Sequence, residues 1–158
     1  MSVQNESPAV AIARAHAEAW SKHDYDTARR GLAPDVRVTA TTTQPMPPAT
    51  DLTGADDYMV GLTQFAQAVV PGSLRILAST GDGRNALLML TVQADFGGGK
   101  VTLPGARLYL LDDNNKIKTE QVIFYQHRND QARGPGPTPP GPRGFRLPCG
   151  RDDTTGIR

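Results

Sequence analysis

The sequence has a single cysteine, Cys149, and lacks any long apolar run. One cysteine excludes an internal disulfide and fits a reducing compartment. Apolar runs such as Ala86–Leu90 are far too short to span a bilayer. The first residues, MSVQNESP, lack the basic and apolar regions of a signal peptide. We therefore expect a cytoplasmic protein without a membrane-spanning segment.

A large charge of either sign is also absent. The 158 residues include 17 Lys and Arg and 16 Asp and Glu, for a net charge of +1. Residues 1–126 carry a net charge of −2 and residues 127–158 a net charge of +3. Basic residues do not cluster with aromatic residues in the first part, so nucleic-acid binding is not expected.

The last part of the chain has a composition of its own. It contains the stretch RGPGPTPPGPRG, and its only large apolar residues are Phe145, Leu147 and Ile157. Such a segment buries too little surface to offset the entropy of ordering it. We predict an N-terminal arm at 1–7, one domain at 8–126 and a disordered tail at 127–158. A polyproline ligand is not favoured, because the PxxP spacing lacks a suitably placed basic residue.

Three helices are predicted in the first half. Ser7 followed by Pro8 is a typical start for a helix that runs to Lys22. Its apolar residues recur at helical spacing at Val10, Ala13, Ala17 and Trp20, with His16 on or beside that face. Asp24 can cap a second helix that ends before Pro34-Asp35. Thr53 begins TGAD, a capping-box pattern for a third helix whose apolar face holds Tyr58, Leu62, Phe65 and Val69.

The remaining segments predict strands. They are Val36–Thr43, Leu74–Thr80, Ala86–Phe96, Val101–Asp112 and Lys116–Gln126. The proline-rich stretch from Gln44 to Asp51 reads as a loop. Pro104-Gly105 predicts a bulge or bend inside its strand. The last two strands, joined by DNNK, form a long hairpin.

Three stretches together resemble a known superfamily. They are AHAEAWSKHDYDTARRGLAPDV, TGADDYMVGLTQF and ARLYLLDDNNKIKTEQVIFY. Over residues 8–126 they resemble nuclear-transport-factor-2-like (NTF2-like) proteins, above all the SnoaL-like and ketosteroid-isomerase-like branch. The resemblance implies an α+β, cone-shaped domain in which three N-terminal helices pack on a curved antiparallel or mixed sheet around an apolar pocket. It also implies a homodimer formed through the outer sheet face. The fold hosts several enzyme classes and non-enzymes, so it does not fix a reaction.

The catalytic positions of these relatives are occupied by different residues here. The tyrosine, the aspartate base and the protonated aspartic acid of ketosteroid isomerases fall at His16, Ala40 and Arg107. Since a methyl group cannot move a proton, that mechanism is not expected. The last-strand acid of the related epoxide hydrolases falls at Val122. No pocket aspartate matches the polyketide cyclases, and Asp95 reads as a solvated hairpin residue.

Another set of residues remains for the pocket that the resemblance implies. His16 is the candidate acid–base, Arg107 the candidate oxyanion stabiliser, and Glu120 their candidate partner. The candidate ligand-binding residues are Trp20, Tyr58, Leu62, Tyr109, Val122 and Phe124. Each also has a structural interpretation: His16 can satisfy a backbone carbonyl, and Arg107 with Glu120 can form a structural ion pair.

The inward register of the last strand is left open by the sequence. Its odd positions, Ile117, Thr119, Gln121, Ile123 and Tyr125, alternate as a core face, whereas the family alignment points Glu120, Val122 and Phe124 inward. A shift of one residue would remove Glu120 from the pocket.

Other chemistries find no support in the sequence. The three histidines have no metal-ligand spacing, CxxC and GxSxG are absent, and GGGK reads as a hairpin turn. We expect no metal and no cofactor. Three hypotheses stay open: a binder of a small apolar molecule with weak or no catalysis; an isomerase, dehydratase or cyclase acting on a carbonyl compound; and a non-catalytic dimeric interaction module.

Overall fold

The computed structural model describes residues 6–42 and 50–124, all within one compact unit, Met1–His127. The helices are α1 (Pro8–Ser21), α2 (Tyr25–Arg30) and α3 (Ala55–Ala66), and the strands are β1 (Leu32–Thr42), β2 (Thr50–Thr53), β3 (Arg75–Gly81), β4 (Asn85–Asp95), β5 (Lys100–Leu111) and β6 (Ile117–Phe124). The predicted tail, 127–158, and residues 1–5 of the predicted arm at 1–7 lie outside the described residues. None of the described helices is long and apolar enough to cross a membrane.

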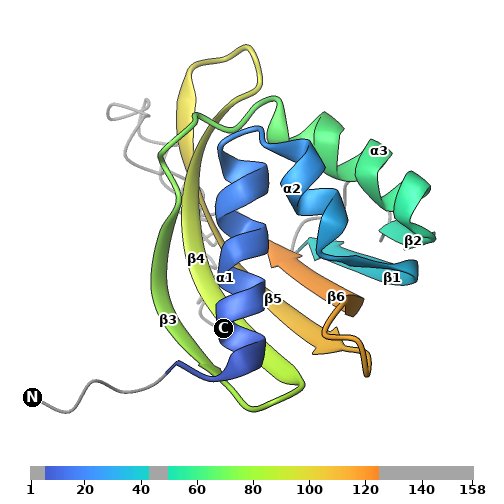
Figure 1. Ribbon diagram of the computed structural model, residues 1–158. Helices are drawn as coiled ribbons and strands as arrows, with labels where there is room; N and C mark the ends of the chain where they lie inside the picture. Colours follow the sequence, from blue (N-terminus) through green and yellow to red (C-terminus); the bar gives the residue numbers. More distant parts are fainter. Residues whose placement is uncertain (1–5, 43–49, 125–158) are drawn as a thin grey trace, which may run out of the picture. The chain divides into compact units, whose positions relative to one another are not determined.

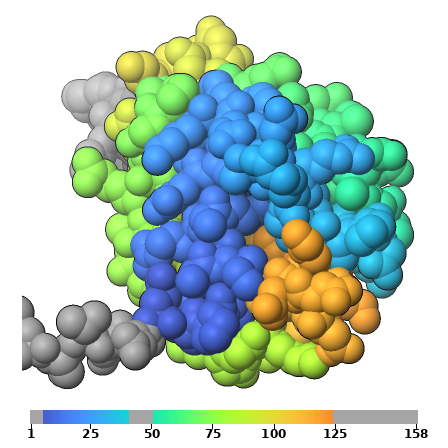
Figure 2. Space-filling model, viewed as in Figure 1, coloured from blue at the N-terminus to red at the C-terminus, as the bar shows by residue number. Residues whose placement is uncertain are grey.

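The six strands form one curved, mixed sheet in the order β2-β1-β6-β5-β4-β3. The β1–β6 pair is parallel, and the other neighbouring strands are antiparallel. Helix α1 lies along the concave side of the sheet, and α3 packs on β1 and β2 (Figure 1). Figure 2 shows α1 and α2 covering this side of the molecule. The expected α+β class with a mixed sheet is confirmed.

The two predicted N-caps at the start of the chain are present. The Ser7 hydroxyl accepts a hydrogen bond from the Val10 amide at 3.3 Å, and the Asp24 carboxylate accepts one from the Thr27 amide at 3.2 Å. These bonds satisfy amides that the first turn leaves unpaired. They fix where α1 and α2 begin, and therefore the face on which His16 lies.

The capping box predicted at Thr53 is wrong. Thr53 pairs with Arg37 as the last residue of β2, and α3 begins after Gly54 without a side-chain cap. Gly54 has a backbone φ of 99°, which residues other than glycine rarely adopt. This conformation lets the chain turn from strand β2 into helix α3. The predicted loop from Gln44 to Asp51 is also too long, because β2 begins at Thr50.

Of the two expectations that rested on proline, the end of the second helix before Pro34-Asp35 is confirmed and the bulge at Pro104 is wrong. Helix α2 ends at Arg30, and Pro34 lies inside β1, where the pairing with β6 is interrupted between Leu32 and Arg37. Proline is tolerated there because the ladder is already broken. Pro104 causes no bulge, since the β4–β5 register runs without a shift from Asn85 to Asp95.

The last strand combines both registers that the sequence left open. Ile117 pairs with Leu111, but Thr119 pairs with Leu110, so Lys118 is an extra residue on β6. This bulge reverses which positions face inward. Ile117 is fully buried, and beyond the bulge Glu120 and Val122 are buried while Gln121 is exposed.

Candidate functional site

Four polar side chains from four elements are buried together in the core. They are His16 on α1, Tyr58 on α3, Arg107 on β5 and Glu120 on β6. Their exposed fractions are 3%, 2%, 3% and 0%. Apart from Ser21, the other buried residues of the described part are apolar or aromatic. We call these four residues the polar network.

Strand alternation explains why the sheet contributes these residues. Arg107 and Tyr109 lie two apart on β5, so both face the concave side. Arg107 is opposite Val122, and Tyr109 is opposite Glu120. The neighbouring inward positions on β4 and β1 are apolar: Ala86, Leu88, Val38 and Ala40. The network therefore faces an otherwise apolar interior.

Arg107 and Glu120 form the ion pair that their strands predicted. The distance from Arg107 Nη1 to Glu120 Oε1 is 2.6 Å. The guanidinium also lies over the Trp20 ring, 4.4 Å from its centroid, a cation–π contact. Burial opposes the charged guanidinium, but the Glu120 carboxylate together with Tyr109 and Tyr58 outweighs it, so the pKa of Arg107 is raised. The arginine is therefore held in its charged form.

Tyr58 connects the ion pair to the histidine. Its hydroxyl donates a hydrogen bond to Glu120 Oε2 and lies 2.9 Å from His16 Nε2. Burial, together with the adjacent Glu120 charge, raises the pKa of Tyr58 well above its ordinary value. The phenol consequently stays protonated and can act only as a neutral hydrogen-bonding group.

Both ring nitrogens of His16 are engaged within the protein. Nδ1 lies 3.1 Å from the Ala28 carbonyl, and Nε2 faces Tyr58. A carbonyl only accepts, so this contact places a hydrogen on Nδ1. Burial lowers the pKa of His16, with Glu120 acting in the opposite direction and Arg107 in the same one. The ring is therefore neutral near pH 7 in the ligand-free protein.

Two further buried donors lie beside Arg107. The indole nitrogen of Trp20 and the hydroxyl of Tyr109 make no hydrogen bond within the described part of the chain. The Tyr109 hydroxyl lies close enough to Glu120 and Arg107 for both groups to affect its pKa. Burial and the Glu120 charge raise the pKa of Tyr109, so it keeps its proton.

The other expected pocket residues are placed as follows. Leu62 and Val122 are buried in the core, and Phe124 belongs to β6, but its side chain lies outside the described residues. Ala40 on β1, which occupies the position of the ketosteroid-isomerase aspartate base, is opposite Val122 on β6. Within the described residues, no group of three His, Cys, Asp or Glu side chains could hold a metal ion.

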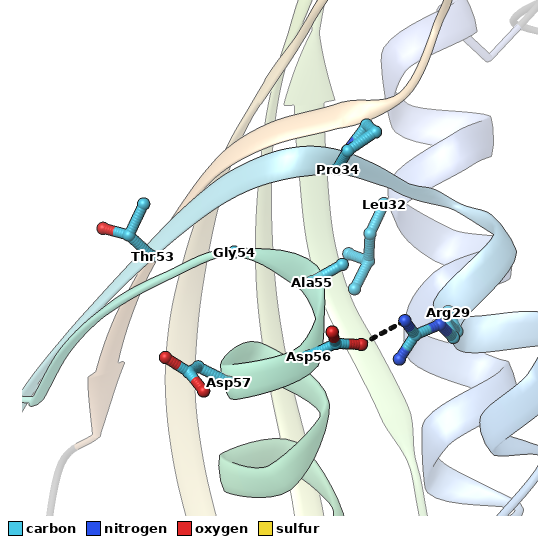
Figure 3. Close-up of a pocket in the computed structure, with 8 residues that line it drawn as sticks. All are labelled: Arg29, Leu32, Pro34, Thr53, Gly54, Ala55, Asp56 and Asp57. Atoms are coloured by element: carbon cyan, nitrogen blue, oxygen red, sulfur yellow. Dashed lines mark hydrogen bonds and ion pairs between the residues drawn. The ribbon is translucent and has the colours of Figure 1, made fainter.

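A surface cavity of about 520 Å³ lies elsewhere and was not anticipated. It is lined by Arg29, Leu32, Pro34 and the residues from Thr53 to Asp57, and an ion pair between Arg29 and Asp56 crosses it (Figure 3). No member of the polar network lines this cavity. In the sequence, Gly54 belongs to the TGAD cap pattern, which does not indicate a cavity.

Comparison with known proteins agrees with this architecture. The family model of the SnoaL-like domain matches residues 13–120, a range that contains the whole polar network. No curated protein matches the chain.

Three solved structures illustrate the similarity. A Kribbella flavida protein is 27% identical, with 75% of this chain and 88% of that chain covered and a TM-score of 0.63. An LEH-like epoxide hydrolase from Mycobacterium tuberculosis is 19% identical, with 74% and 82% covered and a TM-score of 0.58. A second M. tuberculosis protein, in complex with estradiol-17β-hemisuccinate, is 15% identical, with 74% and 93% covered and a TM-score of 0.61.

Proposed function

The chain belongs to the SnoaL-like domain family, and we propose that it binds a small, largely apolar molecule through a hydrogen-bond-accepting group, with weak or no catalysis. The binding groups in this proposal are Arg107, Trp20 and Tyr109. Leu62 and Val122 supply apolar contacts, and Phe124, whose side chain lies outside the described residues, stays a candidate. The accepting group is a carbonyl or a carboxylate oxygen.

The observation that carries the proposal is the pair of buried donors without an acceptor. Trp20 Nε1 and the Tyr109 hydroxyl are both buried beside a charged guanidinium. A buried donor that lacks a partner costs about 1–3 kcal/mol, so native structures rarely retain one without a reason. A ligand oxygen placed between these side chains would accept from both of them and interact favourably with Arg107.

The hydrogen bonds of His16 and Glu120 favour binding over catalysis. His16 Nδ1 is held by the Ala28 carbonyl, His16 Nε2 is covered by the Tyr58 hydroxyl, and each Glu120 oxygen is held by Arg107 or Tyr58. A general base must reach the proton that it removes. Tyr58 contacts both His16 Nε2 and Glu120 Oε2, so a substrate would have to displace Tyr58 to reach either atom.

The nature of one structural neighbour's ligand is compatible with this proposal. Estradiol-17β-hemisuccinate, bound to the M. tuberculosis protein, combines a large apolar body with acceptor oxygens. Because that protein is only 15% identical, its ligand suggests a chemical class to screen and not a specific substrate.

The second candidate is an isomerase, dehydratase or cyclase in which His16 is the acid–base and Arg107 stabilises an oxyanion. The contact between His16 and Tyr58 favours it, because a hydroxyl at 2.9 Å can pass a proton to or from the ring. The third candidate, a dimeric interaction module without a ligand, becomes the conclusion if no small molecule binds.

The test is a thermal-shift screen with matched apolar probes. Naphthoate and the acetonaphthone with the same substitution offer a carboxylate or a ketone on one apolar body. Either should raise the melting temperature of the native protein. Tyr109→Phe and Trp20→Phe should each weaken binding by about three- to tenfold, the value of one hydrogen bond.

The controls separate the three candidates. Tyr25→Phe removes a hydroxyl of the same kind outside the network and should leave binding unchanged. Binding that survives all substitutions unaltered would remove Trp20 and Tyr109 from the site. Exchange of the acetyl protons of acetonaphthone with deuterated water, lost in His16→Gln, would favour the enzyme.

A further inference from the structure

The hydrogen bonds of the polar network require one more proton than its groups supply near neutral pH. The Ala28 carbonyl fixes a hydrogen on His16 Nδ1, so a neutral ring leaves Nε2 bare. The bare Nε2 and the carboxylate Oε2 of Glu120 then face the same Tyr58 hydroxyl from different sides. Both are acceptors, and Tyr58 has a single hydrogen to donate.

One added proton would complete both hydrogen bonds. Placed on His16 Nε2, it is donated to the Tyr58 oxygen while Tyr58 donates to Glu120. Placed on Glu120 Oε2, it is donated to Tyr58 while Tyr58 donates to Nε2. The two forms interconvert when the N–H bond of His16 breaks, an O–H bond forms at Tyr58, and the original Tyr58 proton passes to Glu120. The total charge is the same in both.

The charges around this chain of groups are few and can be named. Arg107 and Tyr109 face it from β5, Glu120 from β6 and Tyr58 from α3, while α2 contributes only the Ala28 carbonyl. The inward positions of β1 and β4 are apolar, as given above. Both tyrosines keep their protons, because burial raises the pKa of each. With a neutral His16, the positive charge of Arg107 and the negative charge of Glu120 therefore balance.

An anionic ligand against Arg107 would upset this balance. It would add a second negative charge to a buried site that holds one positive charge. An uncompensated buried charge is costly, whereas a proton entering the network restores neutrality and completes the hydrogen bonds of Tyr58. A neutral ketone in the same place adds no charge and creates no such demand.

We propose that binding of an apolar carboxylate against Arg107 is accompanied by uptake of one proton into the His16–Tyr58–Glu120 chain. This inference rests on the proposed function and specifies its pH dependence. Carboxylate binding becomes tighter as the pH falls, by up to about tenfold per pH unit, while ketone binding does not change.

Isothermal titration calorimetry of the full-length protein tests this directly. Naphthoate and acetonaphthone are titrated near pH 7 in phosphate and in Tris, two buffers with very different ionisation enthalpies. The dependence of the observed heat on the buffer gives the number of protons taken up. We expect a value approaching one for naphthoate and zero for acetonaphthone.

Two tyrosine variants then locate the proton. Tyr58→Phe removes the shared hydroxyl and should abolish proton uptake while naphthoate still binds. Tyr25→Phe, its matched control outside the network, should keep the uptake of the native protein. Circular dichroism checks that both variants fold. If Tyr58→Phe does not fold, the comparison of naphthoate with acetonaphthone in the native protein still decides the proposal.

The outcomes distinguish this inference from the function on which it rests. Naphthoate binding without proton uptake would overturn the inference alone. Proton uptake that persists unchanged in Tyr58→Phe would also overturn the inference alone. If neither probe binds the native protein, both the proposed function and the inference are wrong.

Discussion

Arg107 and Glu120 form an ion pair diagonally across two strands, although neither is the other's direct partner in the sheet. Arg107 is opposite Val122 and Glu120 is opposite Tyr109, yet Nη1 and Oε1 are 2.6 Å apart. Diagonal neighbours on one sheet face lie within reach of a long side chain such as arginine. The diagonal pairing places Tyr109 beside both charges.

The first prediction concerns the stability that this ion pair confers. Glu120→Gln should lower the free energy of unfolding by about 3–5 kcal/mol, because it leaves the Arg107 charge buried without its partner. Urea unfolding followed by circular dichroism measures the change. The control is Asp51→Asn, which breaks the exposed pair with Arg37 and should change stability little. A small loss of stability in Glu120→Gln would mean that other groups compensate the buried charge of Arg107.

A second prediction concerns the pH dependence of stability without ligand. Because burial lowers the pKa of His16, the unfolded chain takes up a proton near pH 6.5, whereas the folded protein does so only at lower pH. The native protein should therefore lose stability as the pH falls below about 6.5, and His16→Gln should remove that part of the loss.

Urea unfolding of both proteins at a series of pH values between about 5 and 8 measures this difference. His23→Gln is the matched control, because His23 lies outside the polar network and its Nε2 is 3.0 Å from the Val69 carbonyl. A pH profile for His16→Gln that parallels the native one would show that His16 does not titrate differently on folding.

A third prediction concerns association through the outer sheet face. Leu108 and Leu110 face away from the core, as strand alternation predicted, and are 49% and 38% exposed. Met89 on β4 and Leu77 on β3 are also exposed apolar residues. Apolar side chains gathered on an exposed sheet face are typical of an interface, so we expect a homodimer.

Multi-angle light scattering of Leu110→Glu should give the monomer mass. Val60→Glu, on an exposed position of α3, is the control and should keep the mass of the native protein. A native protein that is itself monomeric would contradict the prediction. A dimer that persists in Leu110→Glu would place the interface elsewhere.

The fourth prediction concerns the tail, which lies outside the described residues. Deleting residues 132–158 removes little large apolar surface, so the melting temperature should remain nearly unchanged. Differential scanning calorimetry of the two proteins tests this. A decrease of many degrees would show that the tail packs on the domain, and substitution of Phe145 and Leu147 would then identify the contact.

The site shows where sequence reasoning succeeded and where it stopped. The inward direction of Arg107 and the burial of His16 follow from periodicity within single elements, so they could be predicted. The pairing of Arg107 with Glu120 depends on the register of β6, which the bulge at Lys118 sets. The hydrogen bonds of His16 could not be predicted, because Ala28 and Tyr58 are 12 and 42 residues away along the chain. Because Ala28 and Tyr58 contact the two ring nitrogens, the case for His16 as a direct acid–base is weaker.

Local chemistry written in the sequence determined most of the elements. The Ser7 and Asp24 caps, the helical apolar spacing and the strand alternation act over a few residues, so they are legible before folding. The tertiary structure alone decided the start of α3 and the inward face of β6. Pairing of Thr53 with β1 moved the N-cap of α3 from Thr53 to Gly54, and the bulge at Lys118 reversed the alternation that the sequence suggested. Both depend on hydrogen bonds between segments distant in sequence, which no local pattern records.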